Sequence, residues 1–140
     1  MLQKVSALSW PDRWLLVEAV ANLAVARLQI SIVPFNRLAP GLSRTGFGRR
    51  PDASRLAEQV GWSVRAAAGR TPWPSTCLVQ AVAAKRMLQR RTIPSSLYLG
   101  VAKNAEEGLD GHAWLCYDQA FLTGKHGHER YTITAVFADT

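Results

Sequence analysis

Residues 76–102, TCLVQAVAAKRMLQRRTIPSSLYLGVA, change their hydrophobic period halfway along. From Thr76 to about Arg91, small and apolar residues recur at the spacing of one helix face: Cys77, Ala81, Ala84 and Leu88. Basic residues gather near the C-terminal end of this helix, where the helix dipole favours cations: Lys85, Arg86, Arg90 and Arg91. After Pro94 the period becomes two, as in a strand, with apolar residues at Leu97, Leu99 and Val101. The stretch predicts a helix, capped by Ser75 or Thr76, whose small residues let a sheet approach closely.

The chain after this stretch continues in strands and turns. A turn at residues 103–110 precedes a strand from Gly111 to Tyr117, in which alternate residues share a face: His112, Trp114 and Cys116. A tight turn at Asp118-Gln119 leads into a short strand at 120–122, and a polar loop at 124–130 precedes a last strand at 131–137. This order predicts an antiparallel meander.

The first half of the chain has helical periodicity. Ser9 is placed to cap a helix that ends at about Val33, before Pro34, and its broad apolar surface predicts burial on more than one side. Residues 34–51 are rich in Pro, Gly and Arg and predict a basic loop, and a second helix follows from Pro51-Asp52 to Gly69. Helices first and a sheet last define an α+β fold. We expect a single domain over residues 1–140, with a helical part at 1–70 and a core at 71–140.

Composition and charge narrow the class of protein. With 48% hydrophobic and 19% charged residues, the chain can bury a core. Residues 1–100 carry 14 Lys and Arg against 4 Asp and Glu, whereas residues 101–140 carry 3 against 6. The basic part suits an acidic partner (nucleic acid, acidic peptide, another protein or an anionic membrane), or its arginines simply solvate helix faces. No nucleic-acid motif accompanies it, so we expect no nucleic-acid partner.

Two further features bear on location. Cys77 and Cys116 are too few for the disulfide framework of a small secreted protein. Glu18 and Arg27 interrupt the apolar N-terminal helix, and each would cost about 2.5–3.5 kcal/mol in a bilayer. We therefore expect a cytoplasmic protein without stable membrane insertion.

A cysteine in the first turn of a helix is suited to nucleophilic catalysis. Unpaired N–H groups and the positive end of the dipole favour thiolate, and the same groups can hold an oxyanion. Cys77 has this position in the expected helix, and His112 on a neighbouring strand is the candidate general base and acid. A buried core cysteine is the alternative interpretation of Cys77.

Several segments together resemble a known family: the Cys77-Leu78-Val79-Gln80-Ala81 helix, Ile93-Pro94, the strand at 97–101, Gly111-His112-Ala113-Trp114-Leu115, and Pro34-Phe35-Asn36-Arg37-Leu38 after the first helix. They resemble the transglutaminase-like lasso-peptide maturation proteases, which remove the leader from a lasso precursor. The resemblance spans most of the chain and implies a transglutaminase-like or papain-like core in a stand-alone leader peptidase. It implies Cys77 as nucleophile and His112 as base. It also implies three partners: the precursor's leader region, a separate leader-recognition protein and an asparagine-synthetase-like cyclase.

The chain departs from the family pattern at the third catalytic position. The family places an Asp about twelve residues after the histidine, where this chain has Thr123-Gly124. The third catalytic residue therefore stays open; Asp118 is the carboxylate that we name as a catalytic candidate, and it lies six residues, about 20 Å, along the strand from His112. Asp110, a backbone carbonyl or the Thr123 hydroxyl are the other candidates for orienting the imidazole.

Other motifs carry less chemistry. Trp114 either lines the site or packs in the core, and Cys116 is expected to be a buried thiol. His126-Gly127-His128 has a spacing that can hold zinc, but strand character there is weak, so we expect no metal and no cofactor. Three other functions remain open: a catalytically degenerate module that binds and presents the precursor, a nucleic-acid-binding protein, and a different hydrolase or amidase on the same core.

Overall fold

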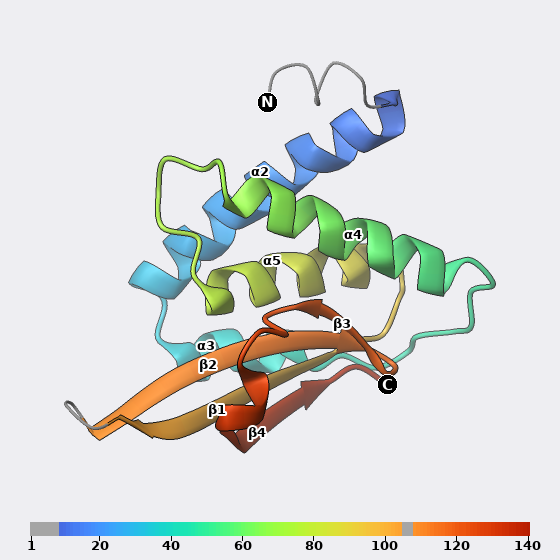
Figure 1. Ribbon diagram of the computed structural model, residues 1–140. Coiled ribbons are helices and arrows are strands. Elements are labelled where there is room, and N and C mark those ends of the chain that lie inside the picture. The colour runs from blue at the N-terminus through green and yellow to red at the C-terminus, as the bar shows by residue number, and fades with distance from the viewer. Residues whose placement is uncertain (1–8, 105–107) are drawn as a thin grey trace.

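The computed structural model describes residues 9–104 and 108–140, and its helices lie on one face of an antiparallel sheet (Figure 1). The helical elements are α2 (Trp10–Ile32), α3 (Phe35–Leu38), the 3₁₀ helix η1 (Ala39–Leu42), α4 (Ala53–Ala68) and α5 (Cys77–Arg90). The later elements are β1 (Ser96–Asn104), β2 (Gly108–Tyr117), β3 (Ala120–Thr123), the 3₁₀ helix η2 (His128–Arg130) and β4 (Thr132–Ala138). The expected α+β class is confirmed. The turn expected at 103–110 falls partly on residues 105–107, which lie outside the described residues.

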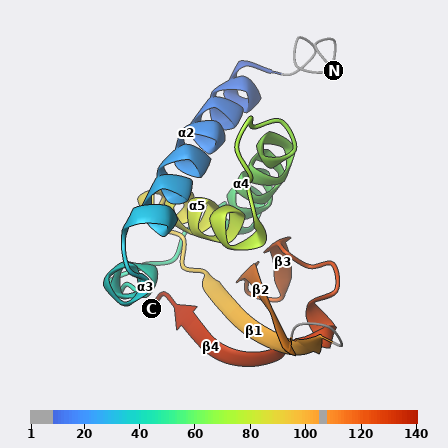
Figure 2. The same ribbon diagram turned by 90° about the vertical axis from the view of Figure 1, so that its left-hand side faces the viewer.

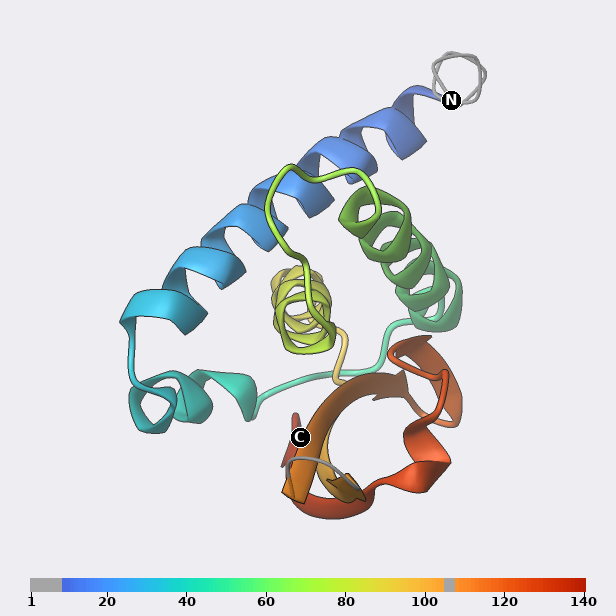
Figure 3. The same ribbon diagram turned by 60° about the vertical axis from the view of Figure 1, so that its left-hand side comes forward.

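Helix α5 lies at the centre of the molecule, with α2, α4 and the sheet around it (Figure 3). Thr76 caps it, since its hydroxyl accepts from the N–H of Val79. Small residues on α5 are fully buried and allow these neighbours to approach closely: Ala81, Ala83 and Ala84. The hydrophobic core therefore gathers round α5, with Leu97, Leu115 and Leu122 contributed by the strands.

The sheet has the order β3-β2-β1-β4, with every neighbouring pair antiparallel. The expected meander is right for β1, β2 and β3 but wrong for the last strand, which pairs with β1 instead of β3. The chain after β3 crosses the sheet face turned away from the helices and returns beside β1, which is a Greek key. His128 on this crossing segment contacts the rings of Trp114 and Phe121.

The N-terminal half differs from expectation in two places. Part of the expected loop at 34–51 is helical, because α3 and η1 occupy residues 35–42, and Leu38 and Leu42 are buried. Helix α2 begins after its cap Ser9, as expected, but it buries only one face, through Ala19, Asn22, Leu23 and Ala26. The prediction that α2 is buried on more than one side is therefore wrong, and its other face is exposed and apolar.

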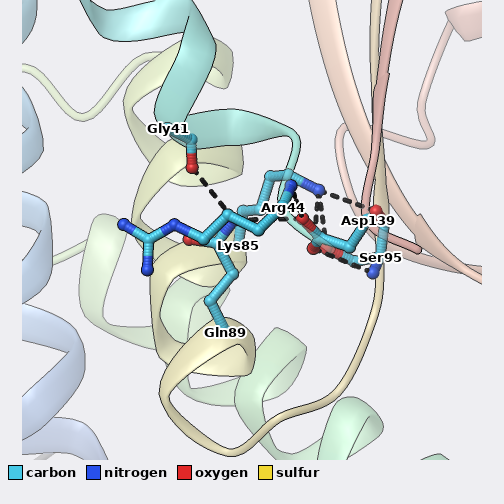
Figure 4. A network of polar contacts seen from close by, with 6 residues as sticks. All are labelled: Gly41, Arg44, Lys85, Gln89, Ser95 and Asp139. Carbon is cyan, nitrogen blue, oxygen red and sulfur yellow. Dashed lines mark hydrogen bonds and ion pairs between the residues drawn. The ribbon is translucent and has the colours of Figure 1, made fainter. Parts of the chain in front are cut away.

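A buried ion pair joins α5 to the end of the chain (Figure 4). Lys85 Nζ lies 3.0 Å from Asp139 Oδ2 and also donates to the carbonyl and hydroxyl of Ser95. The Asp139 carboxylate further accepts from the Gln89 side chain and from the backbone N–H groups of Arg44 and Ser95. Burial lowers the pKa of Lys85, and the hydrogen bond and charge of Asp139 oppose this effect. Lys85 is thus a core residue and not the dipole-facing cation that its position predicted.

We expect Asp139→Asn to destabilise the protein by about 3–5 kcal/mol, because it leaves the buried Lys85 ammonium without its counter-charge. Urea denaturation measures this free energy. The double variant Lys85→Met/Asp139→Asn should recover part of the loss, since no unpaired charge remains. Asp118→Asn is the matched control: Asp118 is exposed at a φ of 53°, which Asn tolerates, and the change should stay within about 0.5 kcal/mol. Equal losses in Asp118→Asn and Asp139→Asn would contradict the interpretation.

A second ion pair ties α2 to the end of α5. Arg91 donates through both terminal nitrogens to the two carboxylate oxygens of Glu18, 73 residues away, at 2.8 and 2.6 Å. This hydrogen bonding lowers the pKa of Glu18 from its usual 4.5, against the opposing effect of burial. The pair is partly exposed, so it makes a modest contribution to stability.

The pair predicts a pH dependence of folding with a definite sign. A carboxylate whose pKa is lower in the folded state stabilises the fold above its unfolded value, here 4.5, and this stabilisation is lost as pH falls through the folded-state pKa. The unfolding free energy of the wild type should therefore fall below about pH 4.5, and Glu18→Gln should flatten part of that fall. An identical acid profile for Glu18→Gln, measured by urea denaturation from about pH 3 to 7, would contradict it.

Candidate active site

Cys77 is the first residue of α5, and its side chain is half-buried against the core. The Thr76 hydroxyl accepts a hydrogen bond from the N–H of Val79, and the Thr76 carbonyl accepts one from the N–H of Gln80. Among the described residues, the N–H groups of Cys77 and Leu78 have no hydrogen-bond acceptor, as is normal for the first turn of a helix. The sulfur thus lies beside backbone donors that are available to a developing oxyanion.

The loop before Cys77 is held by its own hydrogen bonds. Thr71 Oγ1 bonds to the Trp73 carbonyl and to Ser75 Oγ, and Gln80 donates to the Ser75 carbonyl. Trp73 packs against the core, and its buried indole N–H has no hydrogen-bond acceptor in the part of the chain that the structure describes. These bonds fix the entry to α5 and therefore the position of Cys77.

His112 lies in the middle of β2, where its ring is held from two sides. Its Nε2 lies 2.7 Å from the carbonyl oxygen of Gly124, and its ring contacts those of Trp114 and Tyr131. A carbonyl only accepts, so Nε2 carries the proton in this bond, and Nδ1 of the neutral ring keeps its lone pair. The tautomer is therefore set for Nδ1 to act as a base.

The two halves of the predicted catalytic pair belong to different faces of the sheet. Ala113 and Leu115 are the β2 residues that join the core round α5. His112 and Trp114 alternate with them and face the other side, beneath the crossing segment 124–131. No hydrogen bond between Cys77 and His112 is present in the part of the chain described. The structure therefore does not bring these two side chains together.

The position twelve residues after His112 does orient the imidazole, but through a backbone carbonyl. Gly124 supplies that acceptor, one of the alternatives that the sequence left open. The Thr123 hydroxyl is buried, and no described residue forms a hydrogen bond with it. Asp118 lies exposed in the β2–β3 turn, six residues after His112 and beyond the end of β2, so the structure does not place this carboxylate at the imidazole. Sequence analysis could not select Gly124, because every residue has a carbonyl.

The other residues that the sequence singled out as candidates for the site are Trp114, Cys116 and the two histidines at 126 and 128. Trp114 is 4% exposed and stacks on Tyr98, with ring centroids 5.7 Å apart, so it forms a second small core on this face. Cys116 is buried, as expected, and burial raises its pKa to about 11, which makes it a poor nucleophile. Among the described residues, no cluster of His, Cys, Asp and Glu could hold a metal ion, and His128 instead contacts two aromatic rings.

Two surface cavities of the described residues lie away from Cys77, and one of them adjoins the basic loop. A cavity of about 450 Å³ is lined partly by Arg49 and Arg50, and a second of about 550 Å³ lies between α2 and α4. Neither is lined by Cys77 or His112. Arg50 is engaged within the chain, since it bonds to Asp52 and to the Arg91 carbonyl.

Helices that pack on one face of a four-stranded antiparallel sheet define an α+β fold, with Cys77 at the start of α5 and His112 on β2. Within that class, the chain belongs to the transglutaminase-like superfamily, which matches residues 19–136. Members of this superfamily are typically cysteine peptidase-like. No curated protein and no solved structure matches the chain.

We expect Gly124→Ala to destabilise the fold by about 2 kcal/mol or more, since Gly124 has a φ of 72° and an added Cβ would lie 2.3 Å from the Ala113 carbonyl oxygen. Gly127→Ala is the matched control, because Gly127 has a φ of 76° but no atom within 4 Å of an added Cβ. It should cost only the strain of the left-handed backbone, about 1 kcal/mol. Urea denaturation gives both values, and ring NMR signals should shift for His112 in Gly124→Ala alone. Equal effects of the two variants would argue against the close packing of Gly124.

Proposed function

We propose that the protein is a cysteine peptidase that removes the leader from a lasso-peptide precursor, with Cys77 as nucleophile. The observation that carries the proposal is the position of Cys77 at the start of α5, beside the N–H groups of Cys77 and Leu78. Membership of the transglutaminase-like superfamily supports the peptidase class. The lasso precursor as substrate rests on the resemblance of the Cys77 and His112 segments.

In the proposed reaction, Cys77 Sγ attacks the scissile carbonyl carbon, and the amides at the start of α5 hold the oxyanion. His112 accepts the thiol proton at Nδ1 and gives it to the leaving amine, so that the C–N bond breaks and an acyl-enzyme remains. Water then attacks the acyl carbon while His112 takes one of its protons. As the C–S bond breaks, His112 returns that proton to the sulfur, so that Cys77 is a thiol again and the leader leaves as a carboxylic acid. In the structure as it stands, the Gly124 carbonyl accepts from Nε2 and so leaves Nδ1 for the thiol proton.

The separation of Cys77 from His112 adds a condition to this proposal. The precursor and the leader-recognition protein must bring the imidazole to the sulfur, so the isolated chain is inactive. We propose the cytoplasm as the site of this reaction. The cyclase then acts on the freed core peptide.

A second candidate is a catalytically degenerate module that binds the precursor and presents it to partner enzymes. Two observations favour it: His112 and Cys77 face different sides of the sheet, and a glycine stands where the family pattern has an Asp. Such a module would bind the leader without cleaving it.

The two candidates differ in one assay. Precursor is incubated with the protein and the leader-recognition protein, and cleavage is followed by mass spectrometry. The peptidase predicts cleavage that Cys77→Ala abolishes and His112→Ala lowers by about 100-fold or more. Cys116→Ala is the matched control and should cleave like the wild type, since its thiol is buried on the other sheet face. Unchanged cleavage in Cys77→Ala would exclude Cys77 as the nucleophile, and leader binding with no cleavage in the wild type would favour the presenting module.

Alkylation gives an independent test on the protein alone. Iodoacetamide at about pH 8 should leave Cys116 unmodified, because burial raises its pKa to about 11, whereas the half-buried Cys77 should react. Peptide mass spectrometry resolves the two sites. Adding the precursor and the leader-recognition protein should change the rate at Cys77 only, and this change should be absent in His112→Ala. Preferential reaction at Cys116 would show that the assignment of the two cysteines is wrong.

A further inference from the structure

The outer face of α2 is an apolar stripe along the whole helix, and none of the residues described, 9–104 and 108–140, covers it. Figure 2 shows α2 along one side of the molecule, with α4 and α5 on its inner side. Its outward residues are apolar and 46–75% exposed at Trp10, Trp14, Val17, Val25, Leu28 and Ile32, with the exposed Ala21 between them. Seven residues at these positions lie within one narrow sector of the helix, and none of them is charged. We name this set the outer stripe.

The outer stripe has a spacing that is its own mirror image. Its members follow at intervals of 4, 3, 4, 4, 3 and 4 residues, so that Ala21 is the midpoint. The pattern repeats after 11 residues, a period at which a stripe runs almost straight along an α-helix. A sequence position and its counterpart across Ala21 are therefore both on the stripe: Trp10 with Ile32, Trp14 with Leu28, and Val17 with Val25.

We propose that the outer stripe is a homodimer interface in which two copies of α2 pack antiparallel about a two-fold axis at Ala21. A two-fold interface uses the same patch on both copies, so each residue must meet its counterpart across the axis. The mirror-image spacing meets this requirement. At the axis, the two small Ala21 side chains let the helices approach closely, while Trp14 packs on Leu28 and Trp10 on Ile32 of the other copy.

The size of the stripe fits a dimer of moderate affinity. It is about 33 Å long. Its two tryptophans and four branched aliphatic residues are each 46–75% exposed and together present on the order of 500 Å² of apolar surface per copy. The pair would bury on the order of 1,000 Å², the lower bound for a specific interface. Antiparallel helix dipoles also favour this arrangement.

A membrane is the other occupant that the stripe raises, because α2 is long and apolar enough to cross one by length and composition. A core helix of a soluble protein passes the same criterion. Two features favour a second copy. The inner face of α2 packs in the core, and Glu18 is paired with Arg91 of the same fold, so lipid cannot surround α2 while the fold is intact.

Salt distinguishes the two occupants. Each copy carries a formal charge of +7, so two copies repel each other at low ionic strength, and salt should strengthen the dimer. Binding to vesicles of anionic lipid should instead weaken with salt. Sedimentation equilibrium at about 50 and about 500 mM NaCl should show a dimer with a dissociation constant in the micromolar range, tighter at the higher salt.

Ala21→Glu should abolish the dimer, because it places two carboxylates at the axis. Val136→Glu is the matched control, as Val136 is 49% exposed on β4, away from α2, and the dimer should persist. Circular dichroism checks that both variants are folded. A monomer at every concentration and salt, or a dimer unaffected by Ala21→Glu, would overturn the proposal. So would a monomer whose outer stripe binds anionic vesicles.

Engineered cysteines test the register, because a disulfide forms only when the two Cα atoms lie within about 7 Å. Ala21→Cys should cross-link to itself under mild oxidation. Val17→Cys should not, but a mixture of Val17→Cys and Val25→Cys should. Peptide mass spectrometry separates these bonds from any at Cys77. Self-linked Val17→Cys, or no bond at position 21, would overturn the antiparallel arrangement.

Discussion

The rest of the structure depends on the buried ion pair between Lys85 and Asp139. Lys85 uses its donors on Ser95 and Asp139, and the carboxylate accepts from four groups in total, so both ions are satisfied where no water reaches them. Ser95 immediately precedes β1, and Asp139 immediately follows β4. One ammonium on α5 therefore holds the start of one strand beside the end of the other, and this accords with the register that pairs Ser96 with Ala138.

The pair also explains what the sequence could and could not predict about the fold. Local periodicity predicted the helices and strands closely, because a helix face and a strand face are written within a few neighbouring residues. The pairing of β4 with β1 was missed, since it depends on a contact between residues 54 positions apart. Lys85 looked like an ordinary cation near a helix C-terminus, and only the distant Asp139 makes it a core residue. The burial of helix α2 was mispredicted for a related reason. Apolar residues on two faces of a helix predict that both faces are buried, but the sequence does not show whether this chain supplies a neighbour for each face.

At the candidate site, the sequence predicted which residues of β2 share a face, but it did not predict which face turns toward α5. Alternation alone indicated that His112, Trp114 and Cys116 share a face. Both faces of β2 carry apolar residues, however, so the sequence did not say which face meets α5. Glycines supply the answer in the structure: an added Cβ at Gly100 would lie 3.1 Å from the Trp114 ring, and one at Gly124 would lie 2.9 Å from Trp114 Cβ. The indole fits on the far face only because these two positions lack side chains.

This packing limits how a catalytic pair can form. Sliding β2 by one residue would turn His112 toward α5, but it would also move Ala113 and Leu115 out of the core and break their pairing with Leu99 and Leu97. A smaller change is available at the edge of the sheet. Strand β3 pairs with β2 only at residues 115–117, so β3 does not flank β2 at His112, where the Gly124 carbonyl and the crossing segment lie instead. Displacement of that segment would break the bond between Nε2 and the Gly124 carbonyl, but it would leave the Cβ of His112 on the far face, because β1 holds the backbone there through Gly100. A meeting of Cys77 and His112 therefore requires a change in the backbone of β2 at His112 itself, in addition to the release of the segment after β3.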